Sequence, residues 1–182
     1  FFTGHYLAAL IESDMKGSIS EWRRREADGA PGWRTPWSRL NSLSGAFFEM
    51  RNRVARARDP RDRLEEQRRF LCDLLSALGY DPGISTRELN DRSLLPVLAE
   101  VLRPSGEPLL WCVEVRPSDD DGLDLLSSNL GAEQFPDPAD GAPPRFHPRM
   151  TLEDIVSRHI FARDEPPRWL ILAGGGQLLL VD

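Results

Sequence analysis

The pattern of apolar residues changes at Gly79, and this change limits the chain to folds in which helices come first and a sheet follows. Before Gly79 the apolar residues recur at helical spacing. The clearest stretch is residues 60–78, which begins with a capping aspartate and a first-turn proline, Asp59-Pro60. The leucines of this stretch that should face the core are Leu71, Leu74, Leu75 and Leu78. After Gly79 the apolar runs are short and of β type. The sequence therefore predicts an α+β fold.

Residues 1–80 form the predicted helical region. Besides 60–78, the expected helices are 3–11, 18–28 and 37–58. Thr3 is the expected cap of the first, a capping box of Ser18 and Glu21 begins the second, and Pro36 introduces the third. We expect this region to join the sheet region, 81–182, in one compact domain.

The sheet region predicts two hairpins with a helix between them. The expected strands are 94–103 paired with 109–116, and 169–173 paired with 177–181. Thr151 with Asp154 caps the intervening helix, to about Ala162. The glycines 174–176 precede a strand and not a helix, so they predict a tight turn and not a phosphate-binding loop. Residues 117–149 are acidic and rich in proline, which predicts a partly mobile surface insertion.

The net charge of −6 is unevenly divided. Residues 1–80 carry 14 basic and 11 acidic side chains, whereas residues 81–182 carry 9 and 18. Arginine accounts for all basic residues except Lys16. This bias is consistent with a GC-rich genome, and arginine suits bidentate contact with phosphate or carboxylate. The candidate DNA-contacting residues are Arg23, Arg24, Arg25, Arg51, Arg53, Arg56 and Arg58. The alternatives are a protein interface and a solvated helix face, the latter because acidic residues lie among the arginines.

Glu114 is a weak catalytic candidate. Helix, hairpin, helix and strand is the element order of the restriction-endonuclease-like core. In that core an Asp and the Glu of a Glu-x-Lys motif hold a divalent ion, and the Lys orients water. Here Glu114-Val115-Arg116 stands at the second motif. A two-residue turn would place Val97 opposite Glu114 and leave Glu100 on the other face, so the second acid is missing. Three interpretations of the sheet region stay open: a metal-dependent nuclease, an inactive relative of that fold, and an unrelated α+β sheet.

Other reactive residue types predict no site. Cys72 and Cys112 are too isolated for a disulfide framework or a zinc motif, and we expect two buried reduced thiols. The spacing of His5, His147 and His159 predicts neither a metal site nor a triad. No apolar run is long enough to span a bilayer, and no secretory signal is visible, so we expect a cytoplasmic protein without membrane contact.

Framework residues at both ends resemble a known family. The matching segments are 2–7, 74–80, 169–174 and 178–182. They resemble the N-terminal region of large bacterial type IIG-like restriction–modification proteins and their phage-defence relatives, in which an adenine-specific DNA methyltransferase module follows. The resemblance covers most of the chain outside 117–149, and both ends read as cut edges of something longer.

The resemblance implies a parent protein that binds DNA and uses S-adenosylmethionine. The methylation motif Asn/Asp-Pro-Pro-Tyr is absent, since Asp164-Glu165-Pro166-Pro167-Arg168 is not equivalent to it. We therefore expect no cofactor in this chain and no complete catalytic site. The expected function is an accessory N-terminal domain that positions DNA or the downstream domains of the parent. The alternatives are a divalent-metal nuclease with displaced ligands and a protein-interaction module that touches no nucleic acid.

Overall fold

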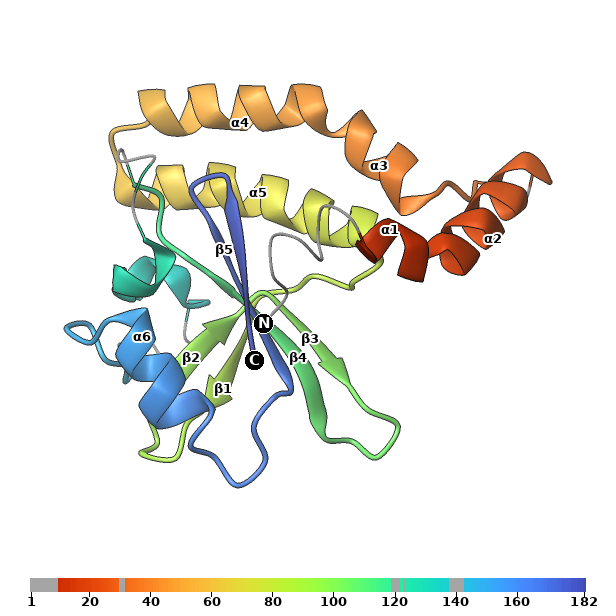
Figure 1. Cartoon of the computed structure of the whole chain (residues 1–182). Helices are drawn as coiled ribbons and strands as arrows, with labels where there is room; N and C mark the ends of the chain where they lie inside the picture. Colours follow the sequence, from red (N-terminus) through yellow and green to blue (C-terminus); the bar gives the residue numbers. More distant parts are fainter. Residues whose placement is uncertain (1–9, 30–31, 119–121, 123, 138–142) are drawn as a thin grey trace. The chain divides into compact units, whose positions relative to one another are not determined.

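The protein has an α+β fold, seen in a computed structural model that describes residues 10–29, 32–118, 122, 124–137 and 143–182 (Figure 1). It divides into two compact units, residues 1–42 and 43–182. The α-helices are α1 (Ile11–Asp14), α2 (Lys16–Ala27), α3 (Pro36–Ser42), α4 (Ser44–Arg56), α5 (Pro60–Leu78) and α6 (Leu152–Ile155). The strands are β1 (Ser85–Glu88), β2 (Leu94–Val97), β3 (Ala99–Leu102), β4 (Pro108–Glu114), β5 (Trp169–Gly174) and β6 (Gln177–Val181).

In the first unit, α2 begins earlier than the capping box predicts. Its first residue is Lys16, so Ser18 lies inside the helix and is not its cap. The reason is that α1 runs almost directly into α2: the Met15 amide donates to Ile11 O and the Met15 carbonyl accepts from Ile19 N. Backbone bonds therefore replace the side-chain cap that the sequence suggested. The helix predicted at 3–11 falls largely on residues outside the described part of the chain.

In the second unit, the predicted first and last residues of α5 are confirmed. Asp59 Oδ1 accepts a hydrogen bond of 2.7 Å from Arg61 N, and the proline follows at the first helical position. Gly79 ends the helix with a left-handed φ of 96°, which a residue with a side chain adopts at a cost. The predicted stretch 37–58 is instead two helices separated at Leu43: α3 belongs to the first unit and α4 to the second.

The main sheet has four strands in the order β3-β4-β5-β6. Strands β3 and β4 are antiparallel, β4 and β5 are parallel, and β5 and β6 are antiparallel. The two predicted hairpins are confirmed, and the helix between them in sequence makes the crossover that a parallel pair requires. Gly175 and Gly176 have φ values of 56° and 77° and form the two-residue turn of the second hairpin.

The first hairpin differs from the prediction in its turn. Ala99 lies opposite Cys112, as predicted, but the loop contains three residues and not two: Arg103 N bonds to Glu107 O and Gly106 takes a φ of 91°. A register shift between Val101 and Leu102 compensates for the extra residue. The predicted strand 94–103 is also divided, since β2 turns away to pair with β1, a strand that the sequence analysis did not predict.

The two faces of the main sheet carry different layers (Figure 1). Toward α5, Leu71 and Leu75 are buried against Cys112 and Ala173. Leu74 and Leu78 of the predicted stripe are half-buried. Toward α6, a larger core contains the following residues: Leu152, Ile155, Ile160, Trp111, Val113, Leu170 and Leu172. The sheet is thus covered by helices on both faces, which explains why β4 and β5 are apolar apart from Glu114 at the end of β4.

The segment 117–149 is not the surface loop that its composition predicts. In its described part, Leu125, Leu130 and Phe135 are buried in the α6-side core. Two short 3-10 turns, Leu125–Ser127 and Ala132–Gln134, position these side chains. The free energy gained by burying a few apolar side chains therefore holds this segment on the core, although its overall composition is acidic and rich in proline. The residues Asp119-Asp120-Asp121 lie outside the described part of the chain.

The helix that begins at Leu152 ends at Ile160, whereas the sequence predicts an end at about Ala162. Thr151 caps it as predicted, accepting from Asp154 N at 3.3 Å. The helix is α-helical for one turn only and continues as a π-helix over Val156–Ile160. Among the described residues, no helix is both long and apolar enough to cross a membrane.

Candidate functional site

Glu114, the one match to the nuclease motif, lies at the end of β4 on the face covered by α5. Its side chain is 4% exposed. Arg68 Nε donates to Glu114 Oε2 at 2.8 Å, and Gln67 Nε2 lies 3.4 Å from Oε1. Both oxygens of the carboxylate are therefore directed at side chains of α5.

A hydrogen-bond network surrounds this pair. Gln67 Nε2 also donates to Val115 O at 2.7 Å, and Gln67 Oε1 accepts from Gly175 N at 3.1 Å. Gln134 Nε2 donates to Glu114 O at 2.6 Å, while Arg68 reaches Gln134 O at 3.1 Å. The network thus connects four segments: α5, the end of β4, the β5–β6 turn and the 117–149 segment. Its role in the fold is to hold these segments together.

The protonation of Glu114 is set by opposing influences. Burial raises its pKa above the ordinary value, and the Arg68 guanidinium opposes that shift. A divalent ion at this place would have to displace Arg68, and the residue beside Glu114 on β5 is Ala173, which offers no ligand. The geometry therefore gives Glu114 a structural role.

Glu100 does not join Glu114. It lies opposite Trp111 on β3, and its carboxylate accepts from Trp111 Nε1 at 2.7 Å and from Arg87 of β1. Because Trp111 packs on the α6 side, Glu100 and Glu114 are on opposite faces of the sheet, as the predicted register requires. These hydrogen bonds hold the pKa of Glu100 below its usual range, with Arg87 as the main cause.

Both cysteines are free thiols. Cys112 is fully buried on β4, and burial raises its pKa to about 12. Cys72 on α5 is only partly buried, and burial also raises its pKa. Neither thiol ionises readily, so neither suits nucleophilic catalysis.

The candidate DNA-contacting arginines of the first unit lie on α2 and are exposed. Arg24 forms an ion pair with Glu21 at 2.8 Å and one with Asp28 at 3.3 Å. The Arg25 guanidinium lies 5.0 Å from the ring centre of Trp33. Two of the three therefore have partners on the same unit.

The remaining candidates lie on α4 and just after it, and all are exposed: Arg51, Arg53, Arg56 and Arg58. Arg53 is 3.4 Å from both Glu49 and Glu66. Arg51 lines a surface pocket together with Arg63 of α5 and the glycines of the β5–β6 turn. The structure thus gathers several guanidinium groups over α4 and the start of α5, with acidic residues among them.

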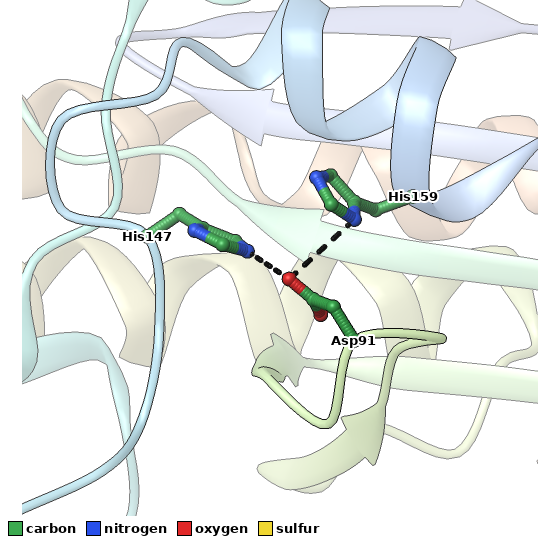
Figure 2. Close-up of side chains that lie close together, drawn as sticks. All are labelled: Asp91, His147 and His159. Carbon is green, nitrogen blue, oxygen red and sulfur yellow. Dashed lines mark hydrogen bonds and ion pairs between the residues drawn. The ribbon is translucent and has the colours of Figure 1, made fainter.

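Asp91, His147 and His159 form a second cluster, which sequence spacing did not indicate (Figure 2). Asp91 is in the turn between β1 and β2, His147 precedes α6, and His159 is on the π-helix. His147 Nε2 is 2.5 Å from Asp91 Oδ2, and His159 Nδ1 is 3.7 Å from the same oxygen. Three segments that are distant in sequence therefore direct one carboxylate and two imidazoles at a common point.

The Asp91 carboxylate is held in place from its other side. Its Oδ1 accepts from Ser93 Oγ at 2.6 Å and from Ser93 N at 3.1 Å. These bonds, and the contact with His147, hold the pKa of Asp91 well below its usual range. The side chains of Asp91, His147 and His159 are 35%, 29% and 18% exposed, so the cluster is open to solvent.

Fold and site together define an α+β protein with a buried carboxylate network on one face of its sheet and an aspartate–histidine cluster beside α6. Comparison with protein-family models, curated proteins and solved structures finds no match.

Proposed function

We propose that this chain is an accessory, non-cleaving domain of a bacterial DNA methyltransferase-type restriction or phage-defence protein. It helps to position DNA or the other domains of its parent. In this role the chain acts in the cytoplasm, and S-adenosylmethionine binds to the methyltransferase module of the parent and not to this chain. The proposal is supported by the family resemblance of the framework residues and by the hydrogen bonds that occupy both carboxylate oxygens of Glu114.

The observation that carries the non-cleaving role is the occupied carboxylate of Glu114. Metal-dependent hydrolysis of DNA needs carboxylate oxygens free to bind the ion and, in this class, a second acid nearby. Arg68 and Gln67 take both oxygens of Glu114, and Glu100 is on the far face of the sheet. The order of helix, antiparallel strands, helix and parallel strand in residues 60–174 is compatible with an inactive nuclease-like core.

The DNA-positioning role is supported by the exposed guanidinium groups of α4. Arginine contacts to phosphate fix position on the duplex without reading its sequence. We therefore expect weak binding that is insensitive to sequence, with a dissociation constant on the order of 10⁻⁴ to 10⁻⁶ M at physiological salt.

Fluorescence anisotropy on a labelled duplex tests this role. The logarithm of the affinity should fall with the logarithm of salt concentration, at a slope of roughly −0.9 per phosphate contacted. A variant with Arg51→Glu, Arg53→Glu and Arg56→Glu should lose binding. The matched control carries the same charge change at exposed arginines of the sheet region: Arg103→Glu, Arg149→Glu and Arg168→Glu. Equal binding by the two triple variants, or no wild-type binding at low salt, would exclude the role.

A protein-interaction module without DNA contact is the second candidate. Leu178 and Leu180 are each 51% exposed on β6, an edge strand of the sheet. Exposed apolar side chains on an edge strand favour pairing with another chain or domain. This candidate replaces the DNA-positioning role if the wild type does not bind DNA at low salt or if the two triple variants bind equally.

A further inference from the structure

We infer that Asp91, His147 and His159 form a binding site for a divalent transition-metal ion such as Zn²⁺. Two imidazoles and one carboxylate are a donor set that first-row transition metals favour, and three protein ligands leave a coordination position open. This site goes beyond the proposed function, and it is separate from the Glu114 network on the opposite face of the sheet.

The geometry brings the donors within reach of one ion. The ligand atoms all lie within 4.8 Å of one another. Around a tetrahedral ion with bonds of about 2.0–2.2 Å, donor atoms are about 3.4 Å apart. Asp91 Oδ2 is now 2.5 Å from His147 Nε2 and 3.7 Å from His159 Nδ1, so shifts of about 1 Å or less bring both distances to that value. The two imidazole nitrogens, which are at most 4.8 Å apart, have to approach each other by at most about 1.4 Å. Side chains that are partly exposed can make such shifts.

The scaffold fixes the donors from outside. Ser93 binds Asp91 Oδ1 twice and leaves Oδ2 for the histidines, as outer-shell partners of metal-binding carboxylates do. Leu94 N donates to Arg145 O at 2.7 Å, which ties the turn of Asp91 to the segment of His147. Asn90 Nδ2 donates to Ala162 O at 3.3 Å, which ties the same turn to the end of the helix that carries His159.

Two backbone features point the same way. His159 lies on a π-helix, a geometry that is rare and frequently found at functional sites. The turn beside Asp91 contains Arg92 at a φ of 63°, which is unusual for a residue with a side chain. The side chains show a third feature: the rings of His147 and His159 stack with their centres 4.8 Å apart. A ring nitrogen of each imidazole points toward the Asp91 carboxylate (Figure 2).

The experiment uses the full chain, treated with a chelator and titrated with Zn²⁺ by calorimetry and with Co²⁺ by visible absorption. The wild type should bind one equivalent of Zn²⁺, and Co²⁺ should show the d–d bands of a site with nitrogen and oxygen ligands. His159→Ala and Asp91→Asn should each weaken Zn²⁺ binding more than about 100-fold, and Ser93→Ala about 10- to 100-fold, the effect typical of an outer-shell partner.

Two variants serve as controls. Asp164→Asn removes an exposed acid outside the cluster, and Cys72→Ser removes the more accessible thiol; both should bind Zn²⁺ as the wild type does. Circular dichroism and thermal unfolding without metal establish that each variant is folded, and His159→Gln replaces His159→Ala if the alanine variant is not. Absence of stoichiometric Zn²⁺ binding by the wild type, or unchanged binding by folded Asp91 and His159 variants, overturns the inference.

Discussion

The Arg68 guanidinium on α5 and the Glu114 carboxylate on β4 form an ion pair at 2.8 Å, in which the Glu114 side chain is 4% exposed and that of Arg68 21%. The pair joins the longest helix to the centre of the sheet. Gln67, on the same turn of the helix, supports it with a bond to Val115 O. The Glu114 carboxylate therefore attaches α5 to the sheet.

Loss of one partner of this pair should be strongly destabilising. Removing either partner of a buried ion pair costs about 3–5 kcal/mol, and Glu114→Ala should fall near the lower end because Arg68 keeps some contact with water. Urea unfolding of Glu114→Ala, Arg68→Ala and the double variant gives the coupling energy. The control is the more exposed pair of Arg69 and Glu66 on the same helix, with side chains 62% and 25% exposed, which should contribute less than about 1 kcal/mol. A coupling no larger than that of the control would contradict the buried role.

The chain should not cut DNA. With Mg²⁺ or Mn²⁺, purified protein should leave supercoiled and linear DNA intact, because one carboxylate engaged by arginine cannot hold an ion and activate water. Gel electrophoresis over an extended incubation checks this. Cleavage that disappears in Glu114→Ala would restore the nuclease interpretation, and cleavage that disappears in Asp91→Asn would identify a nuclease with displaced ligands.

The contribution of Glu100 to stability should depend on pH. Its pKa is lowered in the folded state from an ordinary value of 4.5, mainly by Arg87, so its stabilising effect is present above that value and is lost as pH falls through the folded pKa. Glu100→Gln should cost about 1–3 kcal/mol at neutral pH and progressively less below about pH 4.5.

Chemical denaturation at a series of pH values measures this difference. Glu107→Gln, in the same hairpin, is the control, because its ion pair with Arg103 is half exposed and should contribute less than about 1 kcal/mol. A difference between wild type and Glu100→Gln that stays constant down to strongly acidic pH would exclude the proposed linkage.

Burial of the α5 stripe should dominate its contribution to stability. Leu75 is 1% exposed against the sheet, and Leu75→Ala should cost about 2–5 kcal/mol through lost burial and a residual cavity. Leu178→Ala, at a position 51% exposed, should change the free energy of unfolding by less than about 0.5 kcal/mol. Thermal unfolding of the two variants compares them directly, and similar midpoints would contradict the observed packing of α5.

Local signals predicted the elements that local physics controls. Asp59-Pro60 and Gly79 predicted both ends of α5, because a capping carboxylate, a proline and a left-handed glycine act within one turn of helix. The glycines 174–176 likewise predicted a tight turn, although Gly174 is the last residue of β5 and only Gly175 and Gly176 form the turn, both with positive φ.

The sequence analysis missed features that depend on distant partners. Strand β1 has little apolar character, and it is a strand because β2 pairs with it. The 117–149 segment is acidic on average, yet three of its apolar side chains find space in the core, which composition cannot show.

The sequence by itself determined that the chain is an α+β protein, where α5 begins and ends, and that Glu114 has no acid beside it on its own face of the β3–β4 hairpin. These properties follow from periodicity, caps and strand alternation, which act over a few residues. Only the tertiary structure decided that Glu114 pairs with Arg68 and that Asp91 meets His147 and His159. Such clusters form when separate segments pack on one core, and no spacing along the chain encodes the distances between them.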